Sequence, residues 1–294
     1  MTTRRWIPLP LALLVAALAI PPFPVEGEER DRPGEIVVTL EPGASIDTVR
    51  TRHDVELLER IPGTTTYRVR AGRSRRALKR LRRDNLVLKA SANAKVSRHQ
   101  TVAFPNDQLE VLDPSQTDPQ AEFYGQIDDR GQLEALQVDS AGALTESGDE
   151  VIVAVLDTGV ALDHPALAGR LWTNDSEVPG NGVDDDGNGY VDDASGWDFI
   201  ADGPDANETA GTGPIAGHGT FIAGLVALTA PNARVMPLRV LDTAGVGSAF
   251  DAAEALNYAV QHGARVVSMS FGADGREVPR VLRDAIVSAR ELGV

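Results

Sequence analysis

The residues with the clearest potential for chemistry are Asp157 and His218, which lie far apart in the sequence. Asp157 ends the apolar run 151–156 and is followed by Thr158-Gly159. A short apolar run without alternation is typical of a strand buried on both faces, so Asp157 is expected at the carboxyl edge of a parallel sheet, where ligand crevices form. A buried carboxylate needs a partner, and His218 is a suitable one. Such a pair predicts general acid–base chemistry, because the carboxylate holds the imidazole in one tautomer and stabilises its protonated form.

Each of these two motifs is weak by itself. A lone Asp-Thr-Gly is commonly an ordinary turn at the end of a strand, and aspartic proteases use the same three residues. A lone His-Gly indicates even less. Here the two occur together, one after an apolar strand and the other at the start of the apolar helix predicted over 218–228. Their combination favours the catalytic interpretation.

A second candidate site is the acidic segment 180–193, in which five aspartates lie between positions 184 and 193. Counted from Asp184, its oxygen-bearing residues fall at the spacing of an EF-hand calcium loop, with Gly189 at the sharp turn. The predicted calcium ligands are Asp184, Asp186, Asn188, the carbonyl of Tyr190, and Asp192. The position of the usual bidentate glutamate is Ser195, so the site would need a ligand from elsewhere, for which Asp193 and Asp198 are candidates, or a water molecule. A solvated acidic loop is the alternative.

The motifs Asp157-Thr158-Gly159 and His218-Gly219-Thr220-x-x-Ala223-Gly224 resemble two of the three catalytic motifs of the subtilisin-like serine proteases, or subtilases, in the same order. The resemblance implies that Asp157 orients the imidazole and that His218 acts as general base and then acid, while a serine attacks the peptide carbonyl. The acidic segment resembles the calcium-loop insertion of certain bacterial members. Phe221 departs from the family, where many members have a second histidine, and we expect this to affect packing.

Two later segments resemble the strands with which the family holds its peptide substrate. They are 245–247 and 268–272, and backbone groups there would pair with a peptide as an added strand. The implied substrate-binding residues are Gly245, Gly247, Ser270 and Gly272. Ser268 stands where the family often has asparagine. A plain structural role for both segments is an equally open interpretation.

The family's third motif, a Gly-Thr-Ser-like turn carrying the nucleophile, is not found in the 294 residues. We therefore expect a catalytic domain that is incomplete at its carboxyl end, and a chain that is inactive alone although it derives from an endopeptidase. One alternative is a non-catalytic pseudoprotease that binds peptides or another protease. Another is a calcium-binding surface module unrelated to proteolysis.

The expected fold is α/β, with three parts. Residues 1–25 have the layout of a secretory signal peptide, because Arg4 and Arg5 precede an apolar run too short for a stable membrane anchor. Residues 31–103 are predicted to form a small ferredoxin-like α+β domain with the element order β-α-β-β-α-β. Residues 104–294 are predicted to form a parallel-sheet, subtilisin-like domain with strands over 151–156, 234–240 and 264–271 and helices over 252–262 and 278–292. The chain is therefore expected to be secreted.

Before a subtilase-like domain, the small domain resembles the family's propeptide, which implies that it docks on the catalytic domain and inhibits it. Charge supports this docking. The chain has a net charge of −15, yet basic residues predominate in 26–103 and acidic ones in 104–294. Docking should therefore weaken steeply with salt, and the acidic part argues against a nucleic-acid partner. The chain has no cysteine, which excludes disulfides and thiolate chemistry.

Overall fold

The computed structural model describes residues 31–97, 150–208, 215–273 and 278–294. The predicted signal peptide lies outside this range, as does the segment 98–149. Within the described part of the chain, no helix has the length and apolar character needed to cross a membrane.

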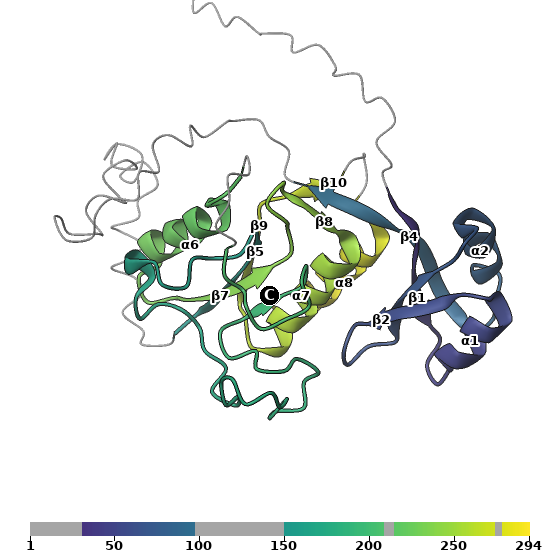
Figure 1. The fold of residues 1–294 in the computed structure, drawn as a ribbon, viewed down its shortest axis with the longest axis horizontal. Coiled ribbons are helices and arrows are strands. Elements are labelled where there is room, and N and C mark those ends of the chain that lie inside the picture. The colour runs from purple at the N-terminus through teal and green to yellow at the C-terminus, as the bar shows by residue number, and fades with distance from the viewer. Residues whose placement is uncertain (1–30, 98–149, 209–214, 274–277) are drawn as a thin grey trace, which may run out of the picture.

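The N-terminal module has the predicted order of elements. They are β1 (Asp31–Leu40), α1 (Ile46–His53), β2 (Glu56–Arg60), β3 (Thr66–Arg70), α2 (Ser74–Leu81) and β4 (Val87–Ser97). The four strands form an antiparallel sheet in the order β4-β1-β3-β2, and both helices lie at the outer end of the molecule (Figure 1).

The alternation of side chains along β1 divides this sheet into two apolar faces. Ile36, Val38 and Leu40 pack with α1 and α2 and form the module's own core. Val37 points to the other face, where it packs with Phe250 of a later helix. The module is therefore apolar on both sides of its sheet, and one side is covered by the rest of the chain.

The second part is a parallel sheet with helices on both faces. Its elements are β5 (Ile152–Asp157), the short 3-10 helix η1 (Pro165–Leu167), β6 (Trp197–Asp198), α6 (His218–Thr229), β7 (Arg234–Arg239), β8 (Val246–Ser248), α7 (Ala249–Gln261), β9 (Val266–Met269), β10 (Gly272–Ala273) and α8 (Arg280–Glu291). The parallel strands have the order β6-β7-β5-β9. Because β5 has later strands on both sides, its carboxyl end lies at a switch point of the kind where α/β sheets bind ligands.

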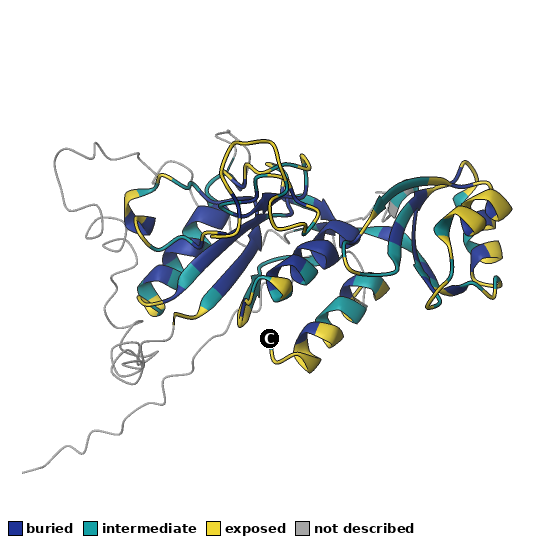
Figure 2. Ribbon diagram, turned by 90° about the horizontal axis from the view of Figure 1, so that it is seen from below, coloured by how far each residue is buried: buried dark blue, intermediate teal, exposed yellow. Residues whose placement is uncertain are grey.

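Successive residues of β5 face opposite layers. Val155 packs with Ala223 and Ala227 of α6, whereas Ala154 and Leu156 belong to the core that includes α7. Figure 2 shows most of β5 and β7 in the colour of buried residues, whereas the residues of β9 are partly buried or exposed. The run predicted to be buried on both faces is buried over residues 153–156, whereas Ile152 is partly buried and Val151 is exposed.

The two parts are joined by β4, a strand of 11 residues. Its first half pairs with β1, and its last residues pair antiparallel with β8 on one side and β10 on the other. The predicted strand over 264–271 is interrupted, since β9 ends at Met269 and β10 begins at Gly272. This break allows the chain to leave the parallel sheet and pair with β4.

Candidate active site and acidic loop

Asp157 and His218 meet at the carboxyl end of β5. The Nδ1 atom of His218 lies 2.7 Å from Oδ1 of Asp157, and the side chains are 7% and 1% exposed. The same oxygen accepts a hydrogen bond from the backbone N–H of Thr158 at 2.8 Å. The other ring nitrogen, Nε2, is thereby left for a proton to be exchanged with a reacting group.

The close approach of the two motifs depends on Gly219. A Cβ atom at this position would lie 2.0 Å from the carbonyl oxygen of Gly159 and 3.2 Å from Cβ of Asp157. No side chain fits in that space, so glycine is required there. Gly217, which precedes α6, has a φ of 85°, a left-handed conformation that glycine adopts readily. Phe221, two residues into the helix from Gly219, is partly buried.

The four predicted substrate-binding residues lie around the end of β4. Gly247 in β8 pairs with Val96, and Gly272 in β10 pairs with Ser97. Gly245 lies in the turn before β8, where its N–H donates to Asp242, and Ser270 lies between β9 and β10. Gly247 also has a packing role, because a Cβ there would lie 2.1 Å from the carbonyl oxygen of Val240.

Two of the predicted calcium ligands, Asp184 and Asp186, lie together with Glu177. Each of these three carboxylates offers an oxygen, and the three oxygens lie within 4.8 Å of one another. Carboxylate oxygens are hard donors of the type that Ca²⁺ and Mg²⁺ prefer, so this cluster fits a hard cation. Asp184 also accepts hydrogen bonds from the backbone N–H groups of Gly187 and Gly189, which shapes the turn.

Glu177 was missed by the sequence reasoning. It is buried, and it accepts hydrogen bonds from the N–H groups of Asp185, Asp186 and Asp192. It precedes the counted loop, and no spacing rule includes it. In the sequence, Glu177 is marked only as an acidic residue close to the acidic segment 180–193.

The remaining predicted ligands make other contacts. The carboxylate of Asp192 accepts from the N–H groups of Asn181 and Gly182 and does not belong to the three-carboxylate cluster. The Asn188 amide donates to Asp186 and to Asp193. The Tyr190 ring is buried, and its hydroxyl donates to Glu254.

Neither residue proposed to complete the loop lies in the cluster. Asp193 is fully buried and accepts from the hydroxyl of Tyr258 at 2.6 Å and from Asn174 at 2.9 Å. Asp198 pairs with Arg239 at 2.7 Å. Both carboxylates attach the loop to the core of the sheet domain.

A second group of carboxylates lies between the N-terminal module and α7. Arg68 of β3 pairs with Asp251 at 2.8 Å and also with Glu59. Burial raises the pKa of Glu59 to about 7 and the pKa of Glu254 to about 9. Burial also raises the pKa of Asp251, against the lowering effect of Arg68.

The chain is similar to known proteins in sequence and in fold. Residues 148–293 match the family model described as the subtilase family. The chain is 33% identical over 135 residues to thermitase of Thermoactinomyces vulgaris, a match that covers 42% of this chain and 38% of thermitase. It is 31% identical over 185 residues to the halolysin-like extracellular serine protease Nep of Natrialba magadii, covering 59% of this chain and 27% of that protein.

The fold is that of fervidolysin from Fervidobacterium pennivorans, a keratinolytic enzyme related to subtilisin. Its crystal structure superimposes with a TM-score of 0.60 at 21% sequence identity. The match covers 92% of this chain and 39% of fervidolysin. The chain thus spans well under half the length of each of these three proteins.

Proposed function

Because the chain belongs to the subtilase family, we propose that its sheet domain performs serine-type peptide hydrolysis with Asp157 and His218 as two members of the triad. The observation that carries the proposal is the buried 2.7 Å contact between Nδ1 of His218 and Asp157 at the carboxyl edge of the sheet. Related proteins named as serine proteases support the same chemistry.

In the proposed reaction, Asp157 accepts the Nδ1 proton of His218 in a hydrogen bond and keeps Nε2 unprotonated. Nε2 then removes the proton of a serine hydroxyl as that oxygen attacks the peptide carbonyl, and delivers it to the leaving amine. Asp157 stabilises the imidazolium formed between these two steps. The 294 residues contain no Gly-Thr-Ser turn, so we propose that they do not hydrolyse peptides alone.

The test begins with the DNA that follows codon 294. A Gly-Thr-Ser turn encoded there would be expressed together with residues 1–294. The extended protein should react with a fluorophosphonate probe and hydrolyse casein, and Asp157→Ala or His218→Ala should abolish hydrolysis. An extended protein that folds but neither reacts nor hydrolyses would refute the proposal. If no such turn is encoded and the 294-residue chain is stable and binds peptides, the peptide-binding pseudoprotease is favoured instead.

We also propose that residues 31–103 form a propeptide that inhibits the domain formed by residues 104–294. The end of β4 supports this proposal, because it occupies the position between β8 and β10 that an added peptide strand would take. Val96, fully buried, pairs with both strands.

This docking can be tested in the intact chain by amide hydrogen exchange. Val96→Asp should raise exchange in residues 246–248, since the buried charge expels the end of β4. Leu88→Asp, at a half-exposed position of the same strand, should leave exchange there unchanged. Equal exchange in the two variants would contradict the docking proposal.

We propose that the loop holds a structural calcium ion through Glu177, Asp184 and Asp186, with Asn188, Tyr190 and Asp192 as the further ligands expected from the loop spacing. A bound cation would remove the mutual repulsion of the carboxylates. It would have no part in the chemistry at His218. We further propose that residues 1–25 direct secretion, in keeping with relatives named as extracellular proteases.

A further inference from the structure

The carboxylate of Glu208 lies between the two catalytic motifs and bonds to both. Its Oε1 accepts hydrogen bonds from the hydroxyl of Thr158 at 2.6 Å and from the backbone N–H of Gly217 at 2.8 Å. Its Oε2 accepts from the hydroxyl of Thr220 at 2.5 Å and from the N–H of the same residue at 3.3 Å. One side chain thus joins the turn after β5 to the start of α6.

The two threonines extend this connection in opposite directions. The hydroxyl oxygen of Thr158 accepts from the N–H of Gly219, in the histidine motif, at 3.0 Å. The hydroxyl oxygen of Thr220 accepts from the N–H of Ala161, just after the aspartate motif, at 2.8 Å. Each hydroxyl can accept across the gap because its own proton is directed to Glu208. The carboxylate therefore sets the orientation of both cross-links.

The start of α6 depends on these contacts. Gly217, the residue before the helix, has no side chain to cap it, yet the first N–H groups of a helix need acceptors. The acceptors here are Glu208, for Gly217 and Thr220, and Thr158, for Gly219. A carboxylate also suits the positive end of the helix dipole. His218 is the first residue of that helix, so its place relative to β5 follows from where the helix begins.

Glu208 is itself fixed to the aspartate motif through its backbone. Its N–H donates to the carbonyl of Val160 at 3.2 Å, and Val160 donates to Ala206 at 3.1 Å. A Cβ at Gly159 would lie 2.9 Å from the carbonyl oxygens of Ala206 and Asn207. The segment 206–208 is therefore packed closely against the turn after β5, and the carboxylate cannot move away without opening this contact.

We propose that Glu208 is a positioning residue that fixes the distance between Asp157 and His218 by joining the two catalytic motifs. This role rests on the proposed function, because positioning matters only if the pair is catalytic. The contact between Asp157 and His218 can nevertheless be measured in a chain that has no activity. Glu208 takes no proton from the substrate in this role. It acts through Thr158, Thr220 and the first turn of α6.

The test is NMR of the 294-residue chain labelled with ¹⁵N in its histidine rings. The wild-type chain should give a low-field ring proton for the bond from His218 to Asp157, assigned by its loss in His218→Gln. In Glu208→Gln one acceptor oxygen becomes an NH₂ group, which cannot accept from either motif. The low-field proton should vanish, or exchange with water about tenfold faster, in line with the loss of one hydrogen bond to a charged group.

Controls separate positioning from general loss of stability. Met236→Ala removes a fully buried side chain in β7, and it should lower the melting temperature while leaving the low-field proton unchanged. Thr220→Val should reproduce the effect of Glu208→Gln, whereas Thr158→Ser, which keeps its hydroxyl, should not. If Glu208→Gln does not fold, the pair Thr220→Val and Thr158→Ser decides the question.

The outcomes distinguish the two proposals. An unchanged low-field proton in Glu208→Gln, or in Thr220→Val, overturns the positioning role and leaves the proposed function intact. Loss of the proton in Met236→Ala as well overturns it too, because any destabilisation would then suffice. A wild-type chain without this proton removes the geometric basis of the proposed function itself.

Discussion

Two groups of acidic side chains in this molecule lie in contrasting environments. In the acidic loop, Glu177, Asp184 and Asp186 accept hydrogen bonds from surrounding backbone N–H groups. Between the module and α7, Glu254 is buried and Glu59 is partly buried, and both lie near Arg68, which pairs with Glu59 and with Asp251. The first environment supplies its carboxylates with backbone donors, whereas in the second burial raises the pKa of Glu59 and of Glu254.

The number of acidic residues is therefore not what distinguishes the two clusters. The availability of backbone N–H groups decides whether the carboxylates of a cluster are suited to bind a cation or to be protonated. A turn such as 184–189 directs several N–H groups toward its carboxylates, and a divalent cation there would replace the repulsion between the carboxylates by attraction. A helix face packed on a sheet has no free N–H groups to offer. There burial raises the pKa of the carboxyl groups and favours their neutral form.

The largest expected effect is that of calcium on the loop. At a calcium concentration about 1,000 times its dissociation constant, the folded chain should gain about 4 kcal/mol, which is roughly a 10 °C rise in melting temperature. Asp186→Ala should abolish the gain. Asp163→Ala, at an exposed position outside the loop, should keep it. Equal melting in calcium and in chelator, measured by calorimetry, would mean that the loop is only a solvated acidic turn.

The next largest effect is a dependence of the chain's stability on pH, which comes from the carboxyl groups between the module and α7. The pKa of Glu59 is raised from 4.5 to about 7 and that of Glu254 from 4.5 to about 9, so the folded, docked chain binds more protons than the unfolded one. Their stabilising contribution is complete below pH 4.5 and is lost as the pH rises through 7 and then 9. Urea unfolding should therefore show a lower midpoint at pH 8 than at pH 5.

Replacing Glu254 by glutamine sharpens this prediction, because glutamine resembles the protonated acid at every pH. Glu254→Gln should reduce the difference between the two midpoints. Glu150→Gln, at an exposed ion pair with Arg234, should not reduce it. A wild-type chain that is more stable at pH 8 than at pH 5 would show that the interface carboxylates are charged after all.

A smaller effect distinguishes two buried tyrosines that serve the two groups. Tyr258 donates to Asp193, which holds the loop, and Tyr190 donates to Glu254. A hydrogen bond to a charged group contributes about 1.5–3 kcal/mol and one between neutral groups about 0.5–1.5 kcal/mol. At pH 6, Tyr258→Phe should therefore cost more stability than Tyr190→Phe. The reverse order in urea unfolding would contradict the raised pKa of Glu254.

Features that depend on neighbouring residues could be predicted from the sequence. The apolar run before Asp157 and the His-Gly-Thr helix start are local patterns. From these two patterns the contact between Asp157 and His218 could be expected. The order of elements in the N-terminal module also follows from local periodicity. Asp184 and Asp186 were found because the turn that gathers them is encoded in consecutive residues.

Features that depend on distant contacts could not be predicted. The sequence Ala90-Ser91-Ala92-Asn93 has little preference for strand, and β4 extends through it because β1, β8 and β10 supply its partners. Glu177 and Glu208 precede their sites without any regular spacing, and only the folded chain brings them to the loop and to His218. No pattern in one sequence marks either residue.

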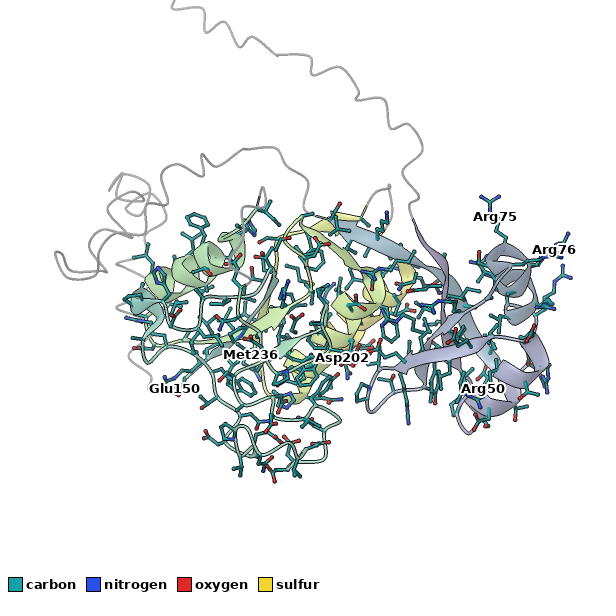
Figure 3. All side chains as sticks on the ribbon, viewed as in Figure 1. Arg50, Arg75, Arg76, Glu150, Asp202 and Met236 are labelled. Atoms are coloured by element: carbon teal, nitrogen blue, oxygen red, sulfur yellow. The ribbon has the colours of Figure 1, made fainter. Side chains whose placement is uncertain are left out.

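The opposite net charges of the two parts could be predicted from the sequence, but the positions of the cations at the interface could not. The smallest expected effect concerns these positions. The cations that pair across the interface are Arg32, Arg68 and Lys89 of the strands. Arg75 and Arg76 of the basic helix α2 lie at the end of the molecule away from α7 and α8 (Figure 3). Total charge therefore overstates the attraction, and the salt dependence of docking should be modest.

Lys89→Met tests this point, because Lys89 pairs with Asp284 at 2.9 Å with both side chains partly exposed. Its loss should cost about 0.2–1 kcal/mol at low salt and less at high salt, measured by hydrogen exchange in residues 246–248. The double variant Arg75→Gln/Arg76→Gln removes more charge, yet it should change nothing at either salt concentration. If it weakens docking as much as Lys89→Met does, the field of the whole module attracts the acidic domain, and the few ion pairs at the interface do not explain the docking.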